Sequence, residues 1–152
     1  MEKAVGSASI DYKTDWAQQG LLGRVKSVQF VGSDYVVQFT AEGKQIDGPA
    51  ESTKFNGRVR EDETCYCTFE TYKFDKLGRV MSVYASDYSM EFKYEGNNYF
   101  PSELKSVYSE PGEELSEDIH KFVYDAKDFD AHGNWLSRLD NGEKQTRVIV
   151  YY

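Results

Sequence analysis

One short turn sequence recurs three times along this chain of 152 residues, and it restricts the fold more than any other feature. The copies occupy residues 39–44 (FTAEGK), 74–79 (FDKLGR) and 129–134 (FDAHGN). In such a segment, Asp or Thr can accept hydrogen bonds from backbone N–H groups two residues on. Gly then supplies the positive φ that closes a loop of three to five residues. Each copy therefore predicts a β-hairpin turn that follows a strand ending on a buried Phe: Phe39, Phe74 or Phe129.

The residues around these turns alternate in the way that strands do. Residues 23–28 (GRVKSV) and 78–83 (GRVMSV) are nearly the same hexapeptide. With period two, Val25 and Ser27 share one face, as do Val80 and Ser82, and the alternate positions lie on the other. Residues 103–108 and 133–138 are looser versions. Further strands are predicted at residues 29–31, 35–40, 65–74, 89–94, 121–129 and 146–152. The pattern predicts an all-β fold, an antiparallel meander of about eight to ten strands forming a curled single sheet or an open barrel.

The C-terminus continues this alternation to its last residue. Asn141-Gly142 is a strong signal for a two-residue hairpin turn. We therefore expect residues 148–152 to be paired in the sheet.

Helix is expected only once, at residues 14–19, where Thr14 can cap the helix and Trp16 can pack on the sheet edge. Residues 45–53 are a predicted loop and residues 109–118 an exposed loop or a long hairpin tip, and neither is long enough to divide the chain. We predict one domain, residues 1–152. Within it, residues 1–20 form an N-terminal segment that we expect to be partly disordered, and residues 21–152 form the meander.

Composition limits the partners of such a domain. The net charge of −8 disfavours nucleic acid, because no cluster of Lys or Arg interrupts the acidic field. No run approaches the roughly 18 apolar residues of a membrane span, so membrane insertion is not expected. The N-terminal residues also lack an apolar signal core, so an exported form would have lost its signal segment.

No arrangement of residues points to a reaction or a cofactor. His120 and His132 are the only histidines, and His132 lies within a repeated turn, where we interpret it as a turn residue. Cys65 and Cys67 would lie side by side on one strand face and are read as packing residues. The spacing of these four residues matches no usual zinc site. Asp125, Asp128 and Asp130 lack the order of a calcium loop, which favours turn capping. We predict no catalytic residue, no metal and no cofactor.

The segment from Tyr72 to Val80, together with Tyr124-Asp125 and residues 129–135, resembles the YD-repeat (RHS-like) family of bacterial β-hairpin repeat proteins. Members place an aromatic-Asp pair before a short turn with Gly and then Arg or Asn. The resemblance covers residues 70–152 well and 20–46 loosely, and Thr40 replaces the Asp in one copy. It implies a continuous curled antiparallel sheet in bacterial proteins that are often exported or surface-attached, and it implies no catalytic residues.

The remaining functional signal is the surplus of aromatic residues: 12 Tyr, 9 Phe and 2 Trp. Exposed on a curved face, they would stack on sugars or grip a protein, and the candidate contact residues are Tyr84, Tyr88, Tyr94, Tyr99 and Trp135. Alternatively, they form the core of a thin sheet and its cross-strand pairs.

Our leading hypothesis is a non-enzymatic bacterial exported or envelope-associated domain that acts through surface contacts with a protein or glycan. One alternative is a glycan hydrolase that uses carboxylates from the central strands. The other is an acidic intracellular protein that neutralises a basic partner.

Overall fold

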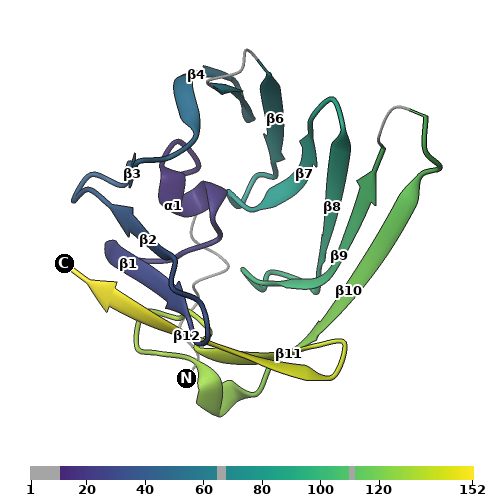
Figure 1. Cartoon of the computed structure of the whole chain (residues 1–152). Helices are drawn as coiled ribbons and strands as arrows, with labels where there is room; N and C mark the ends of the chain where they lie inside the picture. Colours follow the sequence, from purple (N-terminus) through teal and green to yellow (C-terminus); the bar gives the residue numbers. More distant parts are fainter. Residues whose placement is uncertain (1–10, 65–67, 110–111) are drawn as a thin grey trace.

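The computed structural model describes residues 11–64, 68–109 and 112–152. These form one sheet of twelve antiparallel strands with a single four-residue α-helix, α1 (Asp15–Gln18), and a 3-10 helix, η2 (Ala126–Asp128) (Figure 1). The strands are β1 (Val25–Phe30), β2 (Val36–Phe39), β3 (Gln45–Ile46), β4 (Ala50–Asn56), β5 (Val59–Thr64), β6 (Phe69–Phe74), β7 (Val80–Tyr84), β8 (Tyr88–Tyr94), β9 (Pro101–Tyr108), β10 (Ser116–Val123), β11 (Ser137–Asp140) and β12 (Glu143–Tyr151). The predicted all-β antiparallel meander with one short helix is confirmed. No helix in the described part of the chain is long and apolar enough to cross a membrane.

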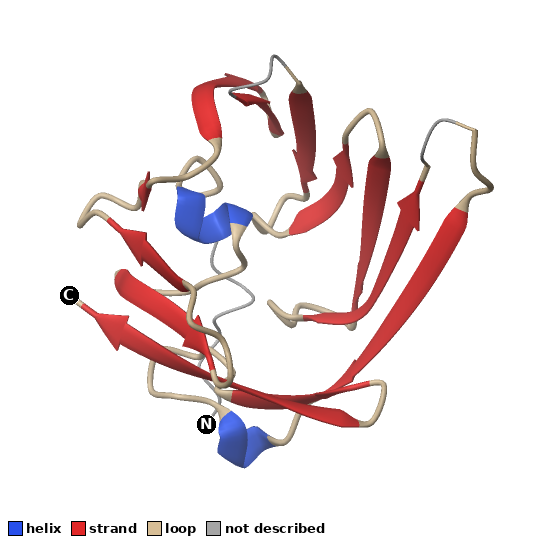
Figure 2. Ribbon diagram, viewed as in Figure 1, coloured by secondary structure: helices blue, strands red, loops and turns tan. Residues whose placement is uncertain are grey.

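The sheet curls until its two edges approach one another. Its order runs from β3 at one edge through β2, β1, β12 and β11 down to β4 at the other. Only three residues separate Ile46 of β3 from Ala50 of β4, so their Cα atoms lie within about 14 Å. The strands β3 and β4 do not pair, and the sheet is therefore a curled, unclosed wall around a central space (Figures 1 and 2).

The three repeated turns share one set of hydrogen bonds. In each copy the polar residue after Phe donates its N–H to the carbonyl of the sixth residue, at 2.8, 2.9 and 2.9 Å. Gly donates back to the polar residue's carbonyl at 3.0, 3.0 and 3.1 Å, with φ values of 90°, 85° and 91°. The side-chain oxygen of the polar residue also accepts from the sixth residue's N–H at 3.2, 3.0 and 3.0 Å. The predicted turn chemistry is confirmed, although Phe129 is only half-buried whereas Phe39 and Phe74 are buried.

The helix α1 lies inside the curl and divides the apolar core. Ala17 packs with Phe74, Val80 and Val83 in one cluster, and Leu21, Val25, Val28 and Phe39 form the other. The predicted cap is confirmed, because the Thr14 side chain accepts from the Ala17 N–H at 3.2 Å. Trp16 donates from Nε1 to the Val25 carbonyl at 2.9 Å and packs against Phe39. The short helix therefore contributes to both clusters.

Two expectations for local structure were wrong. Residues 45–53, predicted as a loop, contain β3 and the first part of β4, whose side chains are mostly exposed and polar. Such an edge strand has no apolar alternation to reveal it.

The predicted strand at 121–129 ends at Val123. The 3-10 helix η2 follows, and the Asp125 side chain caps it by accepting a hydrogen bond from the Lys127 N–H. Cys65 and Cys67 lie outside the described residues.

The C-terminal strand holds the N-terminal third of the sheet against the rest. Along β12, Tyr151 pairs with Val25 and Ile149 with Val28 of β1, and the Tyr152 N–H donates to the Arg24 carbonyl at 3.0 Å. The turn before β12 is the predicted two-residue hairpin, in which Asn141 and Gly142 have φ values of 49° and 85°. The expected pairing of residues 148–152 is therefore confirmed.

Deleting residues 148–152 should lower the melting temperature by roughly 10 °C or more. The deletion removes most of the β1–β12 ladder, and at this chain size each 1 kcal/mol corresponds to about 2–4 °C. Thermal unfolding followed by circular dichroism measures the shift. The control deletes Glu113 and Glu114, which are exposed between β9 and β10, and should leave the melting temperature nearly unchanged. Equal melting temperatures for the wild type and the tail deletion would contradict the assigned role of β12.

Candidate functional site

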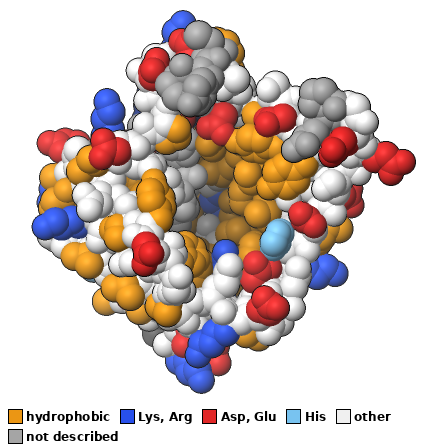
Figure 3. All heavy atoms as spheres, viewed as in Figure 1, with side chains coloured by type: hydrophobic (Ala, Val, Ile, Leu, Met, Phe, Trp, Pro, Cys, Tyr) orange, Lys and Arg blue, Asp and Glu red, His pale blue; other side chains and the backbone are white. Residues whose placement is uncertain are grey.

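The curled sheet encloses two adjoining cavities, of about 790 and 320 Å³. Gln18 of α1, Val37 of β2 and Phe92 of β8 line both, so the two spaces meet beside the helix. Figure 3 shows the centre of the molecule hollowed on the face in view. Both volumes fall in or near the range of about 300–1,000 Å³ that is typical of small-molecule sites. The interior is therefore the candidate functional site.

One wall of the larger cavity is apolar. It is built from Val80 and Val83 of β7 and from Met90 and Phe92 of β8. Figure 3 shows hydrophobic side chains gathered on this side of the hollow, over β7 and β8. Val80 and Val83 are buried, whereas Met90 and Phe92 are half-buried and belong to the edge of the Ala17 cluster. This wall offers an apolar surface to a ligand.

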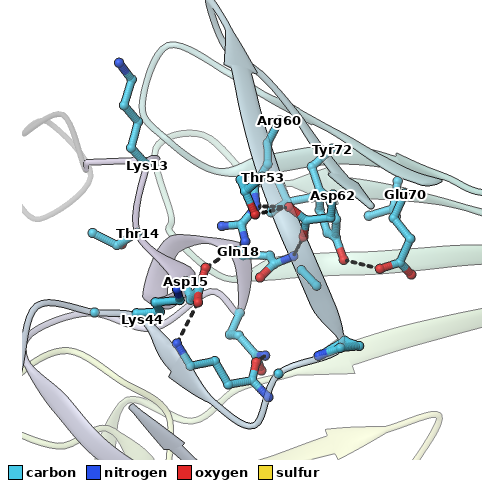
Figure 4. A pocket seen from close by; sticks show the side chains of 18 of the residues that line it. Lys13, Thr14, Asp15, Gln18, Lys44, Thr53, Arg60, Asp62, Glu70 and Tyr72 are labelled. Carbon is cyan, nitrogen blue, oxygen red and sulfur yellow. Dashed lines mark hydrogen bonds and ion pairs between the residues drawn. The ribbon is translucent and has the colours of Figure 1, made fainter. Parts of the chain in front are cut away.

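Another side of the larger cavity is polar and is organised around two charged residues of β5. Arg60 and Asp62 are 3% and 2% exposed and lie two residues apart, so they share the inner face. The Arg60 Nε lies 2.8 Å from the Asp62 Oδ1, and its Nη2 lies 2.7 Å from the Asp15 Oδ1. Gln18 donates to the Asp62 Oδ2 at 2.9 Å. Figure 4 shows these four side chains converging, and we call Asp15, Gln18, Arg60 and Asp62 the clasp.

The clasp joins the two edges of the sheet through α1. Toward the β3 edge, the Asp15 N–H donates to the Gly43 carbonyl at 2.7 Å, and its Oδ2 accepts from the Gln45 N–H at 2.6 Å. Toward the β4 edge, the Asp62 Oδ1 accepts from the Thr53 Oγ1 at 2.8 Å. Burial disfavours the charged form of Arg60, but the hydrogen bonds and charges of Asp62 and Asp15 outweigh it and raise its pKa. The charge of Arg60 is thus held by two carboxylates.

Glu70 of β6 faces the same cavity and is the directly opposed strand partner of Asp62. Burial, and then repulsion from Asp62, raises the pKa of Glu70 above its usual value. The Tyr88 hydroxyl donates to one Glu70 oxygen, and the Tyr72 hydroxyl lies 3.5 Å from the other. By contrast, Asp62 already accepts three hydrogen bonds and is almost fully buried. Of the two carboxylates, Glu70 is the one placed to meet a ligand.

The smaller cavity is aromatic and basic. Trp135, Phe122 and Tyr99 contribute to its wall, together with Arg138 and Arg147. The Arg138 guanidinium carbon lies 3.8 Å from the Phe122 ring centroid and 4.1 Å from that of Trp135. The Arg147 guanidinium carbon lies 3.7 Å from the Trp135 centroid. Two cations therefore stack on a single indole inside the sheet.

The five predicted contact residues do not form one exposed face. Tyr84 is 48% exposed and borders the Lys73 ammonium, whereas Tyr99 and Trp135 are only 6% and 4% exposed. Exposure of Tyr99 and Trp135 is therefore wrong, and the alternative of a place in the core holds for these two, because the curl turns their rings toward the interior. Tyr94, half-buried, lines the smaller cavity with them and donates to the Val80 carbonyl at 2.6 Å. Tyr88 instead reaches Glu70. Their role in ligand contact stays a prediction.

The histidines and the predicted capping residue Asp130 have structural partners. His132 stacks on Tyr151 with ring centroids 3.7 Å apart, in the turn where Asp130 accepts from the His132 and Asn134 N–H groups. The interpretation of Asp130 as a turn cap is confirmed. His120 places its Nδ1 2.9 Å from Asp140. These bonds hold local structure together around the site.

Sequence reasoning missed the residues that organise the interior. Arg60, Asp62 and Glu70 lie in segments whose charged residues occupy both strand faces, so alternation does not mark which of them point inward. No sequence pattern singled out Arg138 or Arg147 either, although each is near an aromatic residue in the sequence. These charged residues could have been identified only after the strand register was known, because the register shows which charged side chains point inward.

Comparison of the chain with protein-family models and with curated proteins finds no match.

Replacing Glu70 with Gln should stabilise the protein at neutral pH. Because the pKa of Glu70 is raised in the folded state, the native protein holds this proton more tightly than the unfolded chain. The Glu70 charge therefore destabilises the fold as the pH rises above the usual carboxyl value of 4.5. We expect Glu70→Gln to melt above the wild type at pH 7.5, with a difference that shrinks toward pH 4.

The matched control is Glu91→Gln, a change at an exposed position on β8. It should show no comparable pH-dependent gain. A Glu70→Gln protein that melts at or below the wild-type temperature at pH 7.5 would contradict the assigned environment.

Proposed function

We propose that this protein is a non-enzymatic binding domain that takes a small ligand into the interior of its curled sheet. The observation that carries the proposal is the pair of adjoining cavities of about 790 and 320 Å³ inside the sheet. Barrels and curled sheets larger than the smallest closed forms commonly enclose ligand space of this kind. On the sequence alone we considered contacts on an exposed curved face, and the proposal places them on the inner face of the curl.

The lining suits a ligand with both apolar and polar parts. Met90 and Phe92 offer an apolar wall, while Glu70 and Tyr72 offer hydrogen-bonding groups beside it. A few convergent polar groups on a mainly apolar surface are the usual composition of a small-molecule site. A glycan fragment and a less polar ligand are both compatible with this lining.

We also propose that the domain works outside the cytoplasm or at the cell envelope of a bacterium. The support is the resemblance of its turns to those of YD-repeat proteins, and in particular the order Phe74-Asp75-x-x-Gly78-Arg79.

A second candidate function is glycan hydrolysis, favoured by the direct cross-strand pairing of Asp62 and Glu70. Two carboxylates with divergent environments are what such chemistry requires. The saturated, buried state of Asp62 favours binding over hydrolysis, since this carboxylate has no free face for a water or a sugar. Release of reducing ends from a glycan panel by the wild type, abolished in Glu70→Gln, would decide for hydrolysis.

The binding proposal can be tested with N-phenyl-1-naphthylamine, an uncharged probe that fluoresces in apolar surroundings. We expect saturable binding to the wild type, and binding about tenfold weaker, or about 1.4 kcal/mol, in Met90→Trp. The larger side chain would fill the space beside Phe92 in the larger cavity. Fluorescence titration measures both affinities.

Glu91→Trp provides the control, because Glu91 is the exposed neighbour of Met90 on β8. It should bind the probe within about twofold of the wild type, a change of about 0.4 kcal/mol against about 1.4 kcal/mol for a tenfold change. Absence of saturable binding to the wild type, or equal weakening in the two variants, would contradict an interior site.

A further inference from the structure

The charged residues that line the smaller cavity are all cationic. They are Arg79, Arg138 and Arg147, and no Asp or Glu among the residues that the structure describes lines this space. The contrast with the larger cavity is sharp, because Asp15, Asp62 and Glu70 are among the residues that line that one. A chain with a net charge of −8 has thus enclosed a cavity whose wall is positive.

Two of these three cations have no ionic partner among the described residues. Arg79 is paired with Asp75 at 2.7 Å within the second repeated turn. For Arg138 and Arg147, by contrast, no carboxylate oxygen of the described residues lies within 4.0 Å. The Arg138 guanidinium donates from Nε to the Gln145 Oε1 at 2.7 Å and from Nη1 to the Tyr124 hydroxyl at 3.3 Å, and both partners are neutral groups. Within the described residues, Arg138 and Arg147 therefore lack a counter-charge.

The wall also contains two buried polar atoms without a hydrogen bond. Within the described part of the chain, Arg147 Nη2 and Tyr99 Oη are buried and have no partner. Arg147 as a whole is 7% exposed, and among the described residues its side chain makes one hydrogen bond, from Nε to the Trp135 carbonyl at 2.7 Å. Both atoms can donate hydrogen bonds, and a buried donor without an acceptor destabilises the folded protein. A ligand that accepts hydrogen bonds from Arg147 Nη2 and Tyr99 Oη would satisfy both atoms.

The environment of Arg147 is consistent with a missing counter-charge. Burial, and then the neighbouring charge of Arg138, lowers the pKa of Arg147 to about 9. Arg138 is also affected, since burial lowers its pKa. The two cations repel one another, and a bound anion would offset both the burial and the repulsion.

We infer that the smaller cavity is the binding site for the carboxylate of an apolar monocarboxylic acid, with Arg138 and Arg147 holding the acid group beside Trp135. The inference rests on the proposed binding function and specifies the ligand class for one part of the interior. Phe122, Leu104 and Val28 also line this cavity and provide apolar surface for the body of the acid. A planar guanidinium can bind a carboxylate through two parallel N–H groups, which suits Arg better than Lys for this role.

The volume limits the size of the acid. About 320 Å³ suits a compact aromatic or short-chain aliphatic acid, and a longer ligand would extend past Phe92 into the larger cavity. Trp135 and Phe122 favour a flat body, because aromatic rings pack well against one another. Naphthalene-2-carboxylate meets these demands and serves as the probe.

Isothermal titration calorimetry on the full chain compares naphthalene-2-carboxylate with naphthalene-2-methanol, which has a similar body and no charge. We expect the acid to bind the wild type at least tenfold more tightly than the alcohol. In Arg147→Met and in Arg138→Met, the affinity for the acid should fall to about that for the alcohol, while the affinity for the alcohol stays within about twofold. The affinity for the acid falls because each variant loses a charge-assisted hydrogen bond, which the uncharged alcohol does not make.

Arg24→Met is the matched control. Arg24 also lies over an aromatic ring, 5.7 Å from the Tyr152 centroid, but it is exposed and does not line the cavity. It should leave the affinity for the acid unchanged. Circular dichroism and melting temperature establish that each variant is folded, and the acid-to-alcohol comparison on the wild type needs no variant at all.

Equal binding of acid and alcohol would overturn the anion site and leave the interior binding function standing. The same holds if N-phenyl-1-naphthylamine binds but neither naphthalene compound does. A loss of acid binding in Arg24→Met as large as in Arg147→Met would also overturn it. If none of the three compounds binds the wild type, the proposed function itself fails.

Discussion

The hydrogen bonds and ion pairs of Asp15 hold together a sheet that does not close on itself. β3 and β4 leave unpaired edges, which proteins must cover or block. The Asp15 carboxylate reaches the backbone of β3 with one oxygen and Arg60 of β5 with the other. Arg60 is buried between two carboxylates, and removing one partner of such a buried pair typically costs about 3–5 kcal/mol. The four-residue helix thus links the two edges of the sheet, which no hydrogen-bond ladder between β3 and β4 joins.

This way of joining the edges also explains the hollow interior. A fully closed small barrel fills its centre with side chains. Here the apolar core is split into two small clusters on either side of α1, and the space between them and the strands remains as cavities. The polar clasp lines the larger cavity and the stacked guanidinium groups of Arg138 and Arg147 line the smaller. The shape of the interior and the charges that line it therefore both follow from the position of α1 between the edges of the curled sheet.

The parts of the fold that depend on local chemistry could be predicted from the sequence. The turns at Asp75 and Asp130, the Thr14 cap and the Asn141-Gly142 hairpin need only neighbouring residues. The clasp could not be predicted, because Asp15 and Arg60 meet only after the whole sheet has curled. The same reason applies to the burial of Trp135, since one sequence pattern fits an exposed aromatic face and an inward one equally well.

Amide hydrogen exchange measured by mass spectrometry, comparing the wild type with Asp15→Ala, tests the clasp most directly. If Asp15 joins the two edges, peptides covering residues 45–46 and those covering residues 50–64 should lose protection together. Peptides from β8 to β10 (residues 88–123) should keep theirs, because their ladders do not involve the clasp. Loss of protection confined to residues 15–18, or spread equally over all strands, would contradict the account.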